Sequence, residues 1–111
     1  MADLNTRFAM EELRSLAFGS IVAGYTAIGD GFDNPAVQII LQNMTDEKLV
    51  FSMDGIVDHI VLPSNGYWDS DIAANRQGNR TARIPLGTIF YVKRLGVPTT
   101  GSVYLTVCYA R

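Results

Sequence analysis

The residue types that carry most protein chemistry are scarce, since the chain has one histidine and one cysteine. His59 would have to serve any Ser-His-Asp or Cys-His arrangement, yet it lies in the strand-like stretch Asp58-His59-Ile60-Val61, without a nucleophile motif nearby. Cys108 falls in an apolar strand pattern, which favours a small buried side chain over a reactive thiol. One Cys and one His cannot complete a usual zinc site. We therefore predict no catalytic residue, no metal site, no cofactor and no enzymatic activity.

Carboxylates and glycines offer two further chemical possibilities. Asp54, Asp58, Asp69 and Asp71 could supply oxygen ligands to calcium, but their spacing matches no calcium-binding loop. Solvated aspartates in turns and at strand edges explain them better. The glycines within residues 29–31 have neither the lysine nor the strand-to-helix context of a phosphate-binding loop, and this pattern indicates a turn.

An aromatic pair suggests a possible ligand platform. Tyr67, Trp68 and Asp69 follow the turn residues Asn65-Gly66, and they could form a sugar-stacking surface at the edge of a β-sandwich. A tryptophan buried in the core or at an interface is the alternative interpretation, and it is the more usual one.

Three arginines give one segment a positive charge within an acidic chain. Arg76, Arg80 and Arg83 lie in the polar stretch of residues 73–83. A solvated loop is one interpretation. The other is a contact with a neighbouring subunit, because arginine is enriched at interfaces and pairs with carboxylates through its planar guanidinium.

The sequence pattern along the rest of the chain predicts the secondary structure in which these residues lie. Short runs rich in Val, Ile, Tyr, Phe and Thr alternate with Gly, Pro, Asn and Asp at about ten-residue spacing. This pattern is typical of an all-β fold, and we predict a single antiparallel β-sandwich, jelly-roll-like, over residues 14–111. Strands are expected over residues 16–26 (one strand or a pair), 36–44, 49–53, 56–62, 67–72, 88–95 and 102–109, with 36–44 and 49–53 as antiparallel neighbours. Alternation places in the core Val37, Ile39, Leu41, Phe51, Val103, Leu105 and Val107.

The first thirteen residues have a different character. Phe8, Met10 and Leu13 are apolar among charged neighbours, without Gly or Pro, which favours a short helix or an arm over residues 1–13. A helix of this length is not stable alone. We therefore predict that these three side chains contact another subunit or protein.

Composition limits the class of protein. The chain has 111 residues, 48% of them hydrophobic and 18% charged, as expected for one globular domain. A formal charge of −2 argues against general nucleic-acid binding. The longest apolar runs are far shorter than the ~20 residues that a membrane-spanning helix requires, so no membrane association is expected.

Four segments resemble a family of small tailed-bacteriophage virion proteins that are encoded among head, neck and tail genes. The resemblance lies in residues 13–21 (LRSLAFGSI), 50–55 (VFSMDG), 87–93 (GTIFYVK) and 98–104 (PTTGSVY). It implies a non-enzymatic structural role in an oligomer, with copies of the chain and other phage structural proteins as partners. It also implies synthesis in the host cytoplasm and a place in the virion. A neck or collar ring, a tail component and a capsid decoration protein all remain open.

A second class of function competes with this one. A carbohydrate-binding β-sandwich module would use the platform of Tyr67, Trp68 and Asp69. A monomer that binds saccharides would favour this alternative, and a symmetric oligomer bound to other virion proteins would favour the first.

Overall fold

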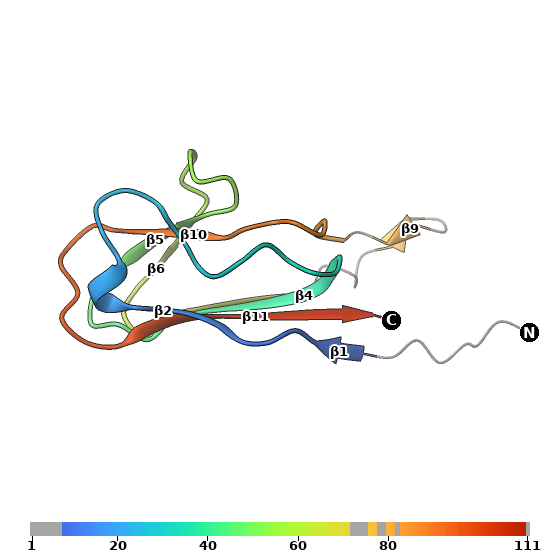
Figure 1. Cartoon of the computed structure of the whole chain (residues 1–111), viewed down its shortest axis with the longest axis horizontal. Helices are drawn as coiled ribbons and strands as arrows, with labels where there is room; N and C mark the ends of the chain where they lie inside the picture. Colours follow the sequence, from blue (N-terminus) through green and yellow to red (C-terminus); the bar gives the residue numbers. More distant parts are fainter. Residues whose placement is uncertain (1–7, 72–75, 78–79, 82, 111) are drawn as a thin grey trace, which may run out of the picture.

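Two antiparallel sheets face each other in the computed structural model, which describes residues 8–71, 76–77, 80–81 and 83–110, with only the backbone described at 71, 76–77 and 80–81 (Figure 1). The five-stranded sheet consists of β1 (Phe8–Met10), β2 (Arg14–Ala17), β4 (Ala36–Asn43), β7 (Tyr67–Asp71) and β11 (Ser102–Ala110). The four-stranded sheet consists of β3 (Thr26–Ala27), β5 (Leu49–Ser52), β6 (Ile60–Leu62) and β10 (Tyr91–Arg94). The predicted all-β sandwich is confirmed.

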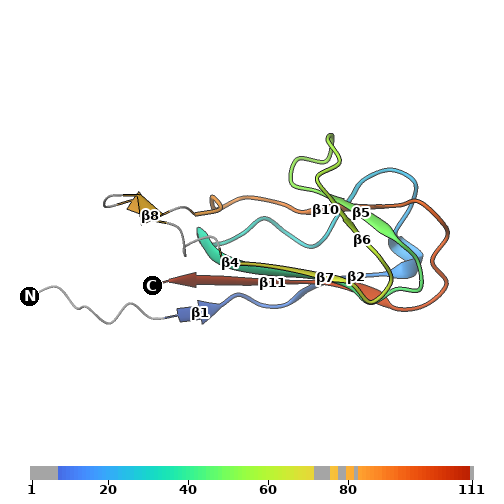
Figure 2. The same ribbon diagram turned by 180° about the vertical axis from the view of Figure 1, so that it is seen from behind.

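The strand order gives the sandwich its topology. One sheet runs β1-β11-β4-β7, with β2 also paired to β11, and the other runs β3-β10-β5-β6. Most connections therefore cross from one sheet to the other, and β5–β6 is a hairpin within one sheet. This order, with first and last strands adjacent and two interleaved Greek keys, is that of a jelly roll. A small two-stranded sheet, β8 (Arg76–Gln77) with β9 (Arg80–Thr81), is inserted between β7 and β10 and projects beyond the end of β4 (Figures 1 and 2).

The core lies between the two sheets. Strands β11 and β4 align Leu105 with Leu41 and Val107 with Ile39, so alternate side chains of both strands point inward. Phe51, from β5, packs against them from the opposite sheet. The seven predicted core residues are all buried, which confirms the alternation argument.

One predicted strand pairing is wrong. Residues 36–44 and 49–53 do form strands, but β4 and β5 lie in opposite sheets and are not hydrogen-bonded neighbours. The buried Asn43, the last residue of β4, stabilises this crossing connection by binding both the turn that follows it and strand β6. Its side-chain amide donates to the carbonyl oxygens of Glu47 at 2.8 Å and Leu62 at 3.1 Å.

A short helix or an arm was expected over residues 1–13, and the helix is wrong for the residues described. Phe8–Met10 is the strand β1, paired with the end of β11, while residues 1–7 lie outside the described part of the chain. Strand β11 is nine residues long, and β2 pairs with its first four, so its other half is left available for β1. Pairing with β11 outweighs the weak helical preference of this short segment. The predicted boundary at residue 13 falls between two strands that share β11 as their neighbour.

Other segments are shorter than expected. Residues 16–26 contain the end of β2, a 3-10 turn (η1, Phe18–Ser20) and the start of β3, and only Ile60–Leu62 of the stretch 56–62 is a strand. Similarly, Tyr91–Arg94 is the strand within 88–95. No helix among the described residues has the length and apolar character needed to cross a membrane.

Candidate functional site

His59 stabilises the loop that joins β5 to β6, and its Nδ1 also lies 3.5 Å from the Ser52 hydroxyl oxygen. It is exposed, and its Nδ1 accepts a hydrogen bond from the backbone N–H of Met53 at 3.0 Å. In the same β5–β6 loop, Asp54 Oδ1 accepts from the N–H groups of Val57 and Ile56 and from the Ser52 hydroxyl. These hydrogen bonds lower the pKa of Asp54 to about 2. The loop projects from the sandwich and is organised by its own side chains (Figure 1).

A second small cluster joins this loop to the body of the four-stranded sheet. The Tyr25 hydroxyl donates to Asp58, and Lys93 Nζ lies 2.9 Å from Asp58 Oδ1. The ammonium also sits 4.7 Å from the centre of the Tyr25 ring, in a cation–π contact. Burial and the neighbouring Asp58 carboxylate raise the pKa of Tyr25 to about 12, so the phenol stays protonated at neutral pH. Tyr25, Asp58 and Lys93 thus tie the loop to the sheet.

Cys108 is buried, as the sequence pattern predicts. Burial, with a smaller contribution from the charge of Asp69, raises the pKa of its thiol, which keeps the thiol protonated. Within the described residues, no group of three or more His, Cys, Asp or Glu side chains is arranged to hold a metal ion.

The structure separates the members of the predicted sugar platform. Tyr67 is 69% exposed and Asp69 is exposed, whereas Trp68, between them, packs against the hydrophobic core. Adjacent residues of a strand point to opposite faces, so Trp68 faces inward and cannot stack with a ligand beside Tyr67. The core tryptophan, which was the alternative interpretation, is the one observed. Asp69 instead accepts a hydrogen bond from Gln38 across the β4–β7 pair at 2.9 Å.

The arginine segment is a hairpin in part, where a loop was predicted. Residues Arg76 and Arg80 belong to β8 and β9, which pair Arg76 with Thr81 and Gln77 with Arg80. Their side chains lie outside the described part of the structure. Arg83 is exposed, close to the bridge that Ile84 makes with Ala36. The interface hypothesis for the three arginines stays a prediction.

The three apolar residues predicted at an interface are all exposed. The exposed fractions are 57% for Phe8, 62% for Met10 and 54% for Leu13. Met10 lies opposite Cys108 and Phe8 lies opposite Ala110, on the face of the five-stranded sheet that points away from the other sheet. We call this face the outer face. Phe8 and Met10 therefore present two large apolar side chains on one side of an edge strand.

The segment that follows β1 is fastened to the body of the protein by Glu11, whose role the sequence did not indicate. The Glu11 side chain is only 3% exposed. Its Oε2 accepts from the backbone N–H of Asn34 at 2.8 Å and from the Asn34 amide at 3.1 Å, and its Oε1 accepts from the N–H of Asp33 at 3.3 Å. Arg14 Nη2 donates to Oε1 at 2.8 Å. Burial alone would raise the pKa of Glu11, but these hydrogen bonds outweigh it and lower the pKa from the ordinary value of a glutamate.

Arg14 binds the preceding residues of the same loop. Its Nε donates to the carbonyl oxygen of Asp30 at 2.9 Å and its Nη2 to that of Gly31 at 3.0 Å. The guanidinium also lies 5.3 Å from the centre of the Phe32 ring. Glu11 and Arg14, which we call the clamp, thus connect the start of β2 to the loop of residues 29–34, far away in the sequence.

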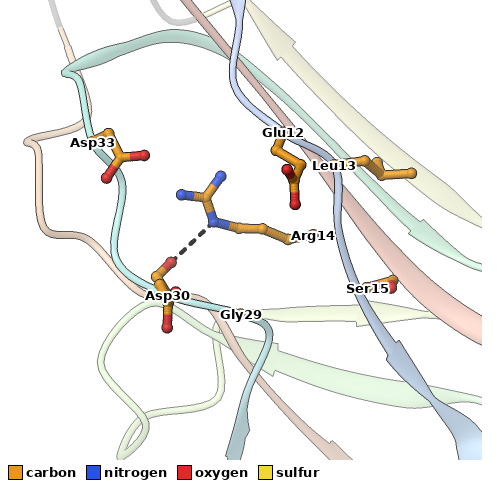
Figure 3. A pocket seen from close by; sticks show the side chains of 7 residues that line it. All are labelled: Glu12, Leu13, Arg14, Ser15, Gly29, Asp30 and Asp33. Carbon is orange, nitrogen blue, oxygen red and sulfur yellow. Dashed lines mark hydrogen bonds between the residues drawn. The ribbon is translucent and has the colours of Figure 1, made fainter.

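The clamp lies beside a surface pocket of about 420 Å³, with the Arg14 guanidinium directed across it toward the backbone of Asp30 (Figure 3). The exposed Leu13 is part of its wall, next to the exposed Glu12. The pocket is lined by Glu12, Leu13, Arg14, Ser15, Gly29, Asp30 and Asp33. Arg14 donates hydrogen bonds to two carbonyl oxygens of the loop, so its guanidinium serves to hold the loop in place.

Replacing the clamp carboxylate should lower stability. We expect Glu11→Ala to reduce the free energy of unfolding by about 2–3 kcal/mol, because four donors lose a charged acceptor. Since the folded pKa lies below the ordinary value, the carboxylate stabilises fully above pH ~4.5, and this contribution is lost as pH falls through the folded pKa. Urea denaturation should therefore show a difference between wild type and variant that shrinks in acid.

The matched control for this experiment is the next residue. Glu12 is exposed and makes no hydrogen bond in the described structure, so Glu12→Ala should change the stability by less than about 0.5 kcal/mol. Equal effects at both positions would contradict the assignment of the clamp.

No protein-family model, no curated protein and no solved structure matches the chain.

Proposed function

We propose that this chain is a non-enzymatic structural component of a tailed-phage particle that assembles as an oligomer with copies of itself and with other phage structural proteins. The four segments that resemble small virion proteins support this proposal, and all four include residues of paired strands: 13–21 contains β2, 50–55 overlaps β5, 87–93 overlaps β10, and 98–104 overlaps β11. The chain would be made in the host cytoplasm and incorporated into the virion.

The observation that carries the proposal is the apolar edge of the five-stranded sheet. Phe8 and Met10 are both more than half exposed on β1, a strand whose partner in the described structure is β11. Single exposed apolar residues are ordinary on a protein surface. Two large ones on an edge strand without charged residues provide a surface that another chain can cover.

The fold itself is compatible with both candidate functions. Jelly rolls occur in viral capsid proteins and in lectin domains, so the fold alone does not decide between an assembly role and saccharide binding. The orientation of Trp68 toward the core removes the main stacking residue from the proposed sugar platform. We therefore prefer the structural role.

The arginine segment fits the same proposal. Arg83 is exposed, and Arg76 and Arg80 lie in the hairpin that projects beyond the sandwich (Figures 1 and 2). Such a projection could contact an acidic surface on a neighbouring protein. The proposal leaves open whether the chain belongs to a neck or collar ring, to the tail or to the capsid surface.

Co-expression with the products of the flanking genes tests the proposed function. We expect the wild-type chain to co-sediment with assembled particles on a density gradient and to withstand a salt wash, because apolar contacts are insensitive to ionic strength. A chain that remains a monomer at the top of the gradient, and that binds immobilised saccharides, would contradict the proposal and support the carbohydrate-binding alternative.

A further inference from the structure

We propose that two copies of this chain join edge to edge through β1, in antiparallel register about a two-fold axis at Ala9, so that their five-stranded sheets become one continuous sheet. This inference rests on the proposed structural role, because it specifies the contact through which copies assemble.

The backbone of β1 has hydrogen-bonding groups directed away from its own sheet. The N–H of Glu11 donates to the Val107 carbonyl at 2.9 Å, which continues the register that pairs Ala9 with Tyr109. In an antiparallel pair, alternate residues direct their N–H and C=O groups to the same neighbour. Ala9 and Glu11 therefore bond to β11, and the groups of Phe8 and Met10 point outward, where the described residues place no other strand.

Symmetry makes this outward edge complementary to itself. With the two-fold axis at Ala9, Phe8 of one copy lies opposite Met10 of the other, and each such pair exchanges both of its hydrogen bonds. Both side chains lie on the outer face, so each Phe8 ring would pack against a Met10 thioether across the new contact. The two most exposed side chains of β1 would thus cover each other.

Two other edge strands, β7 and β6, are less suited to self-pairing. Strand β7 carries the exposed carboxylate of Asp69 on its outer face, and charged side chains discourage pairing with a second strand. Strand β6 exposes one large side chain, Val61 at 55%, and is followed at once by Pro63, which lacks an N–H. Strand β1 has neither a charge nor a proline.

Cysteine cross-linking tests the register directly. In the proposed pairing the two Ala9 residues form a non-hydrogen-bonded pair, with Cα atoms about 4.5 Å apart, within the range of roughly 4.4–6.8 Å that a disulfide requires. We expect Ala9→Cys to give a covalent dimer under mild oxidation at micromolar protein. The wild type should give none, since its Cys108 is buried.

Two matched controls keep the cross-linking result specific. Phe8→Cys places the thiols two residues out of register, more than ~7 Å apart, and should not cross-link. Val61→Cys tests the edge of the other sheet and should remain a monomer on a non-reducing gel. Cross-linking at position 61 or 8, without cross-linking at position 9, would overturn the proposed register.

A proline variant tests the backbone pairing. Met10→Pro removes the outward N–H and leaves the bonds from Ala9 and Glu11 to β11 in place, so the fold should persist by circular dichroism. We expect sedimentation analysis to show wild-type dimers, or larger multiples of a dimer, and to show at least a ten-fold weaker association for the variant. Unchanged association would overturn the inference.

Failure of this inference differs from failure of the proposed function. A wild-type chain that enters particles while Ala9→Cys gives no cross-link would overturn the β1 pairing and leave the structural role intact. A chain that cross-links at position 9 but never enters particles would support the pairing and contradict the structural role.

Discussion

We expect Gly101→Ala to lower the free energy of unfolding by at least about 3 kcal/mol, with a fall in Tm of about 10 °C or more. Gly101 has a φ of +88°, a conformation that residues with a side chain rarely adopt. An added Cβ would overlap the carbonyl oxygen of Met44 and lie 2.9 Å from its carbonyl carbon. Those atoms belong to the backbone, which cannot move aside without disturbing the bond from Met44 N–H to Ser102.

Gly24→Ala is the control for this prediction. At Gly24 an added Cβ meets nothing within 4 Å, and the φ is not in the left-handed region. We expect its unfolding free energy to stay within about 0.5 kcal/mol of the wild-type value in the same thermal and urea experiments. A Gly101→Ala protein as stable as Gly24→Ala would show that the close approach of residues 44 and 101 is wrong.

We expect Asn43→Ala to destabilise the chain by about 3 kcal/mol or more, because Asn43 is fully buried and its side chain joins the two sheets. Its amide donates to the carbonyl oxygens of Glu47, Leu62 and Pro63, and its Oδ1 accepts from the backbone and hydroxyl of Thr45 at 3.0 and 2.7 Å. Alanine leaves these groups buried without partners. Urea denaturation measures the loss, and amide exchange should show faster opening of residues 44–48.

Two variants separate the hydrogen-bond network from side-chain volume. Asn43→Asp keeps the shape but replaces a donor with an acceptor facing three carbonyl oxygens, so we expect a loss at least as large at pH 7. Gln42→Ala, at the neighbouring half-exposed position of β4, should cost less than about 1 kcal/mol. A mild effect of Asn43→Asp would contradict the role of Asn43 as a donor.

Strand pattern and core could be predicted from the sequence because both depend on local alternation. In β4 and β11 every second residue is apolar, and this period alone identifies Leu41 and Leu105 as core residues. The register between the two strands follows from pairing those faces. Alternation also places Trp68 inward, once the limits of β7 are known.

The connections could not be predicted in the same way. Residues 45–48 have the composition of a tight turn, and a hairpin between the flanking strands is the simplest expectation. The jelly roll instead places β4 and β5 in opposite sheets. Hydrogen bonds from Asn43 to the Leu62 carbonyl and from the Ser64 hydroxyl to the Thr45 carbonyl stabilise this arrangement. These contacts span about twenty residues and leave no periodic signal.

The same limit applies to the candidate site. Phe8, Met10 and Leu13 were expected in a short helix or an arm, but Phe8–Met10 is a strand because β11 offers a partner that lies about a hundred residues later. In the sequence, Glu11 cannot be told apart from the neighbouring surface charges. Its burial depends on hydrogen-bond donors at residues 33 and 34, which only the fold brings close. Long-range pairing of this kind becomes visible only in the folded chain.

Imaging of purified phage particles by electron cryomicroscopy tests the central claim most directly. The structural role predicts that the β-sandwich can be fitted into the density of the head, neck or tail at a fixed, symmetric copy number, with Phe8 and Met10 covered by another chain. The account would be contradicted if other proteins explain all the density of the head, neck and tail, and if mass spectrometry of the same preparation does not detect this chain.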